Sequence, residues 1–216
     1  MRKILNFDGY ISNMMDKIAN VICLSFIWFF SSVPIITIGA STTALYYTVN
    51  KCVRHSEGGI WREFWKSFKA EFKQATILWL ILLLVYGLLI ASAYCAYVLY
   101  YTGTGPKMMP IILLVLLAVV TLWAVYIFPF LARFHNSSKQ IMINCAIIAL
   151  MNFRVSLLLL VCVAVALVAA VFVPLSVIFV PVLYMVISCH LLEPVFKKYM
   201  SEEDRRQEEE FYNQQD

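Results

Sequence analysis

The chain has 216 residues, of which 62% are hydrophobic and only 14% are charged. Soluble domains contain about half apolar and about a quarter charged residues, so this composition excludes a soluble globular enzyme and a disordered chain. The mean hydropathy of +0.80 points to a protein that faces lipid. We therefore expect a single integral membrane domain over residues 1–216.

Charged residues are missing from long stretches of the chain. None occurs over residues 18–50 or 155–192, and only Lys107 lies between Lys73 and Arg133. A membrane-spanning helix needs about 20 apolar residues, whereas the strands of a membrane barrel alternate in polarity and these stretches do not. We therefore predict an all-α, polytopic helical bundle with about five transmembrane helices, near residues 18–38, 76–101, 110–132, 155–172 and 174–192.

The first predicted span, 18–38, follows a short basic segment, as the apolar part of a signal peptide would. We expect it to stay in the protein, because Ile38 lies where a cleavage site at residues 39–40 would need a small residue. Pro34 and Gly39 are predicted to break this span, and Thr42 is predicted to cap the next helix through its hydroxyl.

Residues 39–75 are predicted to form a cytoplasmic loop of amphipathic helices. An apolar stripe from Leu45 to Val53 suits a helix that lies against the bundle or the headgroups. Gly58 and Gly59 are predicted to end this helix.

The helix after these glycines has one aromatic face and one basic flank. At 100° per residue, five aromatic residues fall within about 100° of arc, and four cations fall within about 60° beside them. The aromatic residues are Trp61, Phe64, Trp65, Phe68 and Phe72, and the cations are Arg62, Lys66, Lys69 and Lys73. Such a helix suits the interface of a lipid bilayer, where rings enter the acyl boundary and cations reach anionic headgroups. A docking surface for a cytosolic protein is the alternative interpretation.

The apolar run over 155–192 is too long for one membrane-spanning helix, so we predict a turn near residues 173–176. Pro174 and Pro181 are the helix breakers available there. Small residues recur at every fourth position on two of the spans, namely Gly87, Ala91 and Cys95, and Cys162, Ala166 and Ala170. Such stripes let helix backbones approach. We expect them to pack within the bundle, with self-association as the alternative.

Most of the 17 Lys and Arg residues fall on one predicted side of the membrane, in residues 39–75, in residues 133–154 and after residue 192. Cytoplasmic loops of membrane proteins carry this excess. With five spans, the N-terminus is predicted to lie outside and the C-terminus inside the cell. The stretch over 201–216 is acidic and is expected to form a solvated tail.

Two motifs stand in the first half of the chain: PIITIGASTTALYY over residues 34–47, and EGGIWREFWKSFK over residues 57–69, followed by FKQAT over 72–76. With them the chain resembles the YesL-like family of bacterial integral membrane proteins, a family without an established function. Genes of this family commonly lie beside genes for carbohydrate uptake. The resemblance therefore implies a bacterial cell-membrane protein that works beside the permease subunits of a sugar ABC importer.

Catalytic motifs were not found in the sequence. It contains no phosphate-binding loop, no His-Glu-x-x-His motif and no carboxylate pair suited to acid and base catalysis, so we expect no enzyme and no cofactor. No nucleic-acid partner is expected either. His190 and Glu193 lie three residues apart near the inner end of the last span, and we expect an interfacial pair there because two groups make no metal site.

Two functions of different class fit these patterns. The first is an accessory or regulatory subunit of a carbohydrate importer, which follows from the family resemblance. The alternative is a stand-alone small-molecule carrier or substrate-capturing component. Proton coupling is not expected, because the five predicted spans contain no Lys, Arg, Asp or Glu.

Overall fold

The computed structural model describes residues 2–54, 58–102, 106, 108–134 and 137–200, with the backbone alone for residues 2–14 and 16. Within these residues all regular structure is helical, which confirms the predicted all-α class. The helices are α1 (Arg2–Ser32), α2 (Ile38–Thr48), α3 (Ile60–Tyr101), α4 (Met109–Arg133), α5 (Ser138–Met151), α6 (Phe153–Phe172) and α7 (Ser176–Tyr199), with a short 3-10 turn η1 (Ile35–Thr37) and a π-helical segment η2 (Val49–Arg54). The predicted acidic tail, 201–216, lies outside the described residues.

Four helices, α3, α4, α6 and α7, are long and apolar enough to cross a bilayer. The last four predicted spans lie largely within these helices. The first predicted span, 18–38, coincides with the end of α1 and with η1. Its described apolar part, Lys17–Ser32, is shorter than the roughly 20 residues that a crossing requires, so a spanning α1 must also use its earlier turns.

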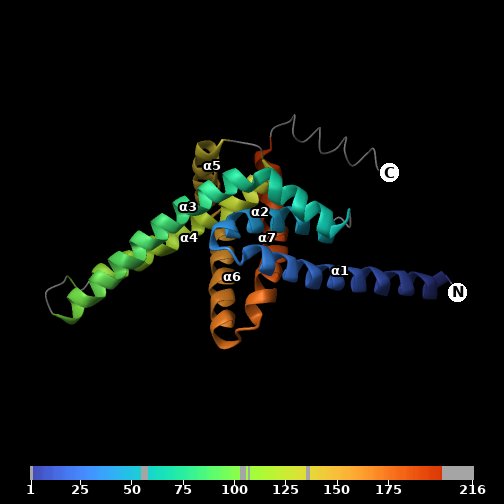
Figure 1. Ribbon diagram of the computed structural model, residues 1–216, viewed down its shortest axis with the longest axis horizontal. Coiled ribbons are helices and arrows are strands. Elements are labelled where there is room, and N and C mark those ends of the chain that lie inside the picture. The colour runs from blue at the N-terminus through green and yellow to red at the C-terminus, as the bar shows by residue number, and fades with distance from the viewer. Residues whose placement is uncertain (1, 55–57, 103–105, 107, 135–136, 201–216) are drawn as a thin grey trace.

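Two helical hairpins diverge from a common centre. Figure 1 shows α3 and α4 running together to one side and α6 and α7 running together in another direction, while α1 leaves the centre toward a third. The short helix α2 lies where these arms meet and contacts α1, α3, α4 and α7. The buried core is therefore concentrated at one end of both hairpins, and their far ends expose apolar side chains.

The apolar stripe allows a position against the bundle or against the headgroups, and α2 takes the first of these. Eight of its residues are buried, among them Ala44, Leu45 and Tyr46. The sequence pattern could not show this, because an apolar stripe suits a helix at a surface as well as one enclosed by neighbours. The α2 helix is a central packing element.

Gly39 and Thr42 are not the break and the cap that the sequence suggests. The chain breaks after Ser32, where Pro34 precedes η1, and α2 already begins at Ile38. The Thr42 hydroxyl donates to the Ile38 carbonyl oxygen at 2.7 Å, a bond inside the helix.

Gly39 instead allows a close approach between α2 and α3. A Cβ atom at this position would lie 2.7 Å from the Ala75 carbonyl oxygen and 2.7 Å from the Trp79 Cβ. The Trp79 indole N–H donates to the Ile35 carbonyl oxygen at 2.7 Å, which holds the two segments together. Glycine is required here because the two backbones leave no room for a side chain.

The amphipathic helix and the second span are one continuous helix of 42 residues. No Gly or Pro occurs between Ile60 and Gly87 to interrupt it. In Figure 1 the first turns of α3 rise from the right, and its later turns descend to the left beside α4, so the helix is curved in this view.

The second half of the chain has two well-defined helix boundaries. The α6 helix ends at Phe172 and α7 begins at Ser176, so the predicted turn near residues 173–176 is confirmed. Ser137 precedes α5, and its backbone N–H and hydroxyl donate to the Gln140 side-chain oxygen at 3.4 and 3.1 Å. This is the capping-box arrangement of a helix start.

The two stripes of small residues differ in environment. Gly87, Ala91 and Cys95 are exposed, and a Cβ atom on Gly87 would meet nothing within 4 Å. Cys162, Ala166 and Ala170 on α6 are half-buried. The expectation that both stripes pack within the bundle is therefore wrong for the stripe on α3.

We expect Gly39→Ala to destabilise the protein, because the new methyl group would meet a backbone oxygen and the Trp79 side chain. The free energy of unfolding should fall by about 1–3 kcal/mol, as measured by thermal unfolding in detergent. Gly87→Ala is the matched control in an open part of a helix, and it should leave the stability unchanged or raise it slightly. Equal effects of the two substitutions would contradict the close approach at Gly39.

Candidate functional site

The five aromatic residues at the start of α3 occupy different environments. Phe64 is fully buried, Trp65 and Phe68 are half-buried, and Trp61 is 65% exposed. The rings form a continuous ladder, with centroids 5.8 Å apart from Trp61 to Trp65, 5.2 Å from Trp65 to Phe68 and 5.4 Å from Phe68 to Phe72. Phe64 belongs to the core, whereas Trp61 and Phe72 lie at the surface.

The basic flank of α3 lies on the surface of the protein. Its cations Arg62, Lys66, Lys69 and Lys73 are all exposed. They follow one another every three or four residues, so they form one strip along the helix surface. We call these four cations the positive strip, and the exposed Trp61 and Phe72 the aromatic edge. The start of α3 thus presents the positive strip directly beside the aromatic edge.

The start of α3 is fixed by the two glycines before it. Gly58 has a φ of +73°, in the left-handed region that favours glycine, and Gly59 is the last residue before the helix. The Glu63 backbone N–H donates to the Gly59 carbonyl oxygen at 3.0 Å. A Cβ atom on Gly58 would lie only 3.1 Å from the Glu63 Cγ, so the turn and the first acidic residue of α3 are packed together.

Glu63 connects α3 to η2. The Lys51 ammonium donates to its Oε2 at 3.1 Å, and the Tyr47 hydroxyl donates to the same oxygen at 3.4 Å. Burial lowers the pKa of Lys51, but hydrogen bonds and electrostatic interactions with Glu63 and Tyr47 outweigh it and raise the pKa above its ordinary value. Lys51 therefore stays charged and holds the amphipathic start of α3 against the core.

Glu193 on α7 is the most deeply buried carboxylate described, with 1% of its surface exposed. Its Oε1 accepts a hydrogen bond from the Tyr46 hydroxyl at 3.1 Å. Its Oε2 lies 3.5 Å from Nη2 of Arg133 and 4.0 Å from Nη1 of Arg54. Burial raises the pKa of Tyr46 well above its usual value, and the neighbouring Cys189 and Glu193 add to the rise, so Tyr46 remains a hydrogen-bond donor.

The expected interfacial pair of His190 and Glu193 is wrong. His190 is exposed, and its Nδ1 lies 2.9 Å from the Val186 carbonyl oxygen, whereas Glu193 points into the core. The position of Glu193 at the end of an apolar run could have predicted a buried ion pair, because a buried carboxylate needs a cation beside it. The partners could not be named from the sequence, since they lie 60 and 139 positions away along the chain.

An apolar groove opens between α1 and the start of α3. Its volume is about 520 Å³. It is lined by Cys23, Phe26, Ile27, Phe30, Ser31, Trp61 and Trp65. We call it the α1–α3 groove. Its walls offer aromatic and aliphatic surface, so it suits an apolar ligand.

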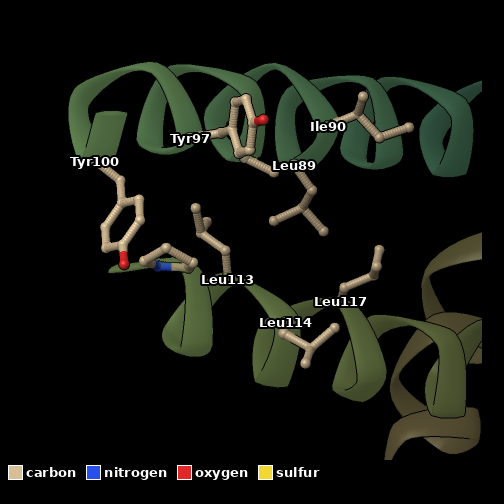
Figure 2. A pocket seen from close by; sticks show the side chains of 9 residues that line it. Leu89, Ile90, Tyr97, Tyr100, Leu113, Leu114 and Leu117 are labelled. Atoms are coloured by element: carbon tan, nitrogen blue, oxygen red, sulfur yellow. The ribbon is translucent and has the colours of Figure 1, made fainter. Parts of the chain in front are cut away.

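A second cavity lies far from these groups, at the other end of α3. It has a volume of about 240 Å³. It is lined by Leu89, Ile90, Ala93, Tyr97, Tyr100, Pro110, Leu113, Leu114 and Leu117. Figure 2 shows side chains of α3 and α4 facing one another across it, with Tyr100 reaching toward the start of α4. Its apolar walls offer few hydrogen bonds to a polar solute.

The exposed features of the described residues are surfaces and grooves that suit binding. In the part of the chain that is described, no three His, Cys, Asp or Glu side chains lie together in a way that could hold a metal ion. The buried ionic groups are engaged in contacts between helices. The exposed features are the aromatic edge and positive strip of α3, the α1–α3 groove and the small-residue stripe on α3.

We expect Glu193→Leu to be strongly destabilising, because it removes a carboxylate that Tyr46, Arg54 and Arg133 share. Loss of one partner of a buried ion pair costs about 3–5 kcal/mol. Thermal unfolding followed by size-exclusion chromatography in detergent measures the effect. His190→Leu, one turn earlier on an exposed face, is the control and should change the stability by less than about 0.5 kcal/mol. Similar melting temperatures for both variants would contradict a structural role for Glu193.

Comparison with known families gives one match. Residues 21–93 match a family described as proteins of unknown function, DUF624. No curated protein and no solved structure matches the chain significantly. The matched region contains the end of α1, all of α2 and most of α3, and therefore the groove, the aromatic edge and the positive strip.

Proposed function

We propose that the chain is a non-enzymatic accessory subunit of a bacterial carbohydrate ABC importer, and that it contacts the importer's permease subunits within the membrane. The motifs over 34–47 and 57–69 support this role through their resemblance to YesL-like proteins, and both lie within the DUF624 match. The observation that carries the proposal is the open stripe of small residues on α3.

This stripe has the chemistry of an unoccupied helix-packing surface. Gly87, Ala91 and Cys95 are exposed on consecutive turns, and Leu84 and Leu88 beside them are 66% and 63% exposed. In a bilayer, helices associate where small residues let their backbones approach, because the hydrophobic effect does not drive them together. We propose that a transmembrane helix of a permease subunit packs on this surface.

The divergence of the two hairpins also favours a subunit of a larger assembly. In each candidate span, only 11–33% of the most apolar stretch of 18 residues is buried within the chain. Figure 1 shows that the far ends of the α3–α4 and α6–α7 hairpins are well separated. Partner helices can therefore pack against the far length of the α3–α4 hairpin, which has few contacts of its own.

A stand-alone carrier for small molecules is the alternative function. A carrier of sugars needs polar groups that converge on a cavity. The two cavities described above are lined mainly by apolar side chains, so neither suits a polar solute such as a sugar. This favours the accessory role over the carrier. Transport by the purified chain in liposomes would instead support the carrier.

The accessory role is tested by co-expression with permease subunits and purification in mild detergent. We expect a stable complex, and we expect Gly87→Leu to lower the recovery of the permease about tenfold by blocking close helix approach. Ala164→Leu, at an exposed position of α6, is the matched control and should leave recovery unchanged. If the Gly87→Leu variant recovered as much permease as the parent chain, the stripe would not be part of the interface. If no complex formed with the parent chain, the accessory role would be overturned.

We further propose that α1 also crosses the membrane, so that the N-terminus lies outside the cell and the start of α3, α5 and the C-terminus lie in the cytoplasm. The excess of Lys and Arg on that side supports this orientation. Labelling of intact cells with a membrane-impermeant maleimide tests it. Met108→Cys, at a 68% exposed position before α4, should be labelled from the medium, whereas Lys66→Cys should not. Labelling of Lys66→Cys from the medium would reverse the orientation.

A further inference from the structure

The α1–α3 groove lies beside two exposed cations. Arg62 and Lys66 each follow a tryptophan that lines the groove, and both are exposed. At 100° per residue, Lys69 is about 40° further round the helix than Trp65. The apolar wall of the groove therefore passes directly into the positive strip of α3.

Glu63, the acidic residue nearest to the groove along α3, is directed to another partner than the positive strip. Glu63 is 7% exposed, and its Oε2 accepts the hydrogen bond from Lys51 on η2, so it points away from the strip. The mouth of the groove is thus electropositive while its walls are apolar.

We propose that the α1–α3 groove binds one acyl chain of an anionic phospholipid, whose phosphate is held by Arg62 and Lys66. The volume of about 520 Å³ lies within the range of small-molecule sites. The charge complementarity of a phosphate with two cations selects an anionic lipid over a zwitterionic one. In an amphipathic helix at a bilayer surface, cations lie at headgroup level and apolar side chains at acyl level, which is the arrangement that this site requires.

This site is independent of the proposed role beside an importer, because it uses α1 and the start of α3 rather than the small-residue stripe. Failure of complex formation with a permease would leave the lipid site untouched. Conversely, loss of lipid selectivity would leave the accessory role untouched.

The test is native mass spectrometry of the full chain in detergent, titrated with phosphatidylglycerol or with phosphatidylcholine of the same acyl chains. We expect one phosphatidylglycerol to be retained in preference to phosphatidylcholine. Each cation near an anionic lipid surface contributes about fivefold in affinity, so Arg62→Gln with Lys66→Gln should weaken binding about 25-fold. Lys139→Gln with Arg154→Gln, at exposed positions of α5 and α6, is the charge-matched control and should have no effect.

A second pair of variants locates the acyl chain. Cys23→Trp should fill the groove and abolish retention of phosphatidylglycerol, whereas Cys95→Trp, also at an exposed position but far along α3, should preserve it. Both variants need melting temperatures close to that of the parent chain, and Cys23→Ser provides a smaller change if tryptophan disturbs the fold. The serine variant should retain the lipid.

Three results would overturn the proposal. The first is equal retention of the two lipids, and the second is unchanged affinity in the Arg62→Gln and Lys66→Gln double variant. The third is retention of phosphatidylglycerol only after residues 201–216 are removed. That outcome would assign the groove to the chain's own acidic tail.

Discussion

A buried carboxylate organises the centre of this protein. Glu193 is 1% exposed, and an ionised carboxylate cannot remain in such a place without compensating charges and hydrogen bonds. Its partners come from α2, η2 and α4, so one group ties three further segments to α7. Correct placement of Glu193 requires these segments to meet at one end of the hairpins, which is where the core is concentrated.

Glu63 extends the same constraint to the surface. It is bound to Lys51 on η2, while the next residue, Phe64, enters the core. These contacts fix the rotation of α3 about its axis. As a consequence, Trp61 and the positive strip face outward, and the α1–α3 groove forms beside them. The buried ionic contacts are thus structural, and they determine which residues are available to lipids or partners.

The family resemblance and the exposed surfaces point to an interacting membrane protein. Most of the surface of its candidate spans is not covered by its own helices. A helix surface with Gly87 at its centre can accept another helix, and an electropositive groove can accept a lipid. These two surfaces lie on different parts of α3, so the chain can use both at once.

The sequence by itself determined the medium, the helical class, the turn near residues 173–176 and the amphipathic start of α3, because each follows from local composition and periodicity. Only the tertiary structure decided that α2 is enclosed, that Gly39 serves a close approach, that Phe64 belongs to the core and that Glu193 pairs with Arg133 and Arg54. These features depend on contacts between residues far apart in the chain. A residue's type and spacing show which faces are apolar, but they do not show which neighbour covers them.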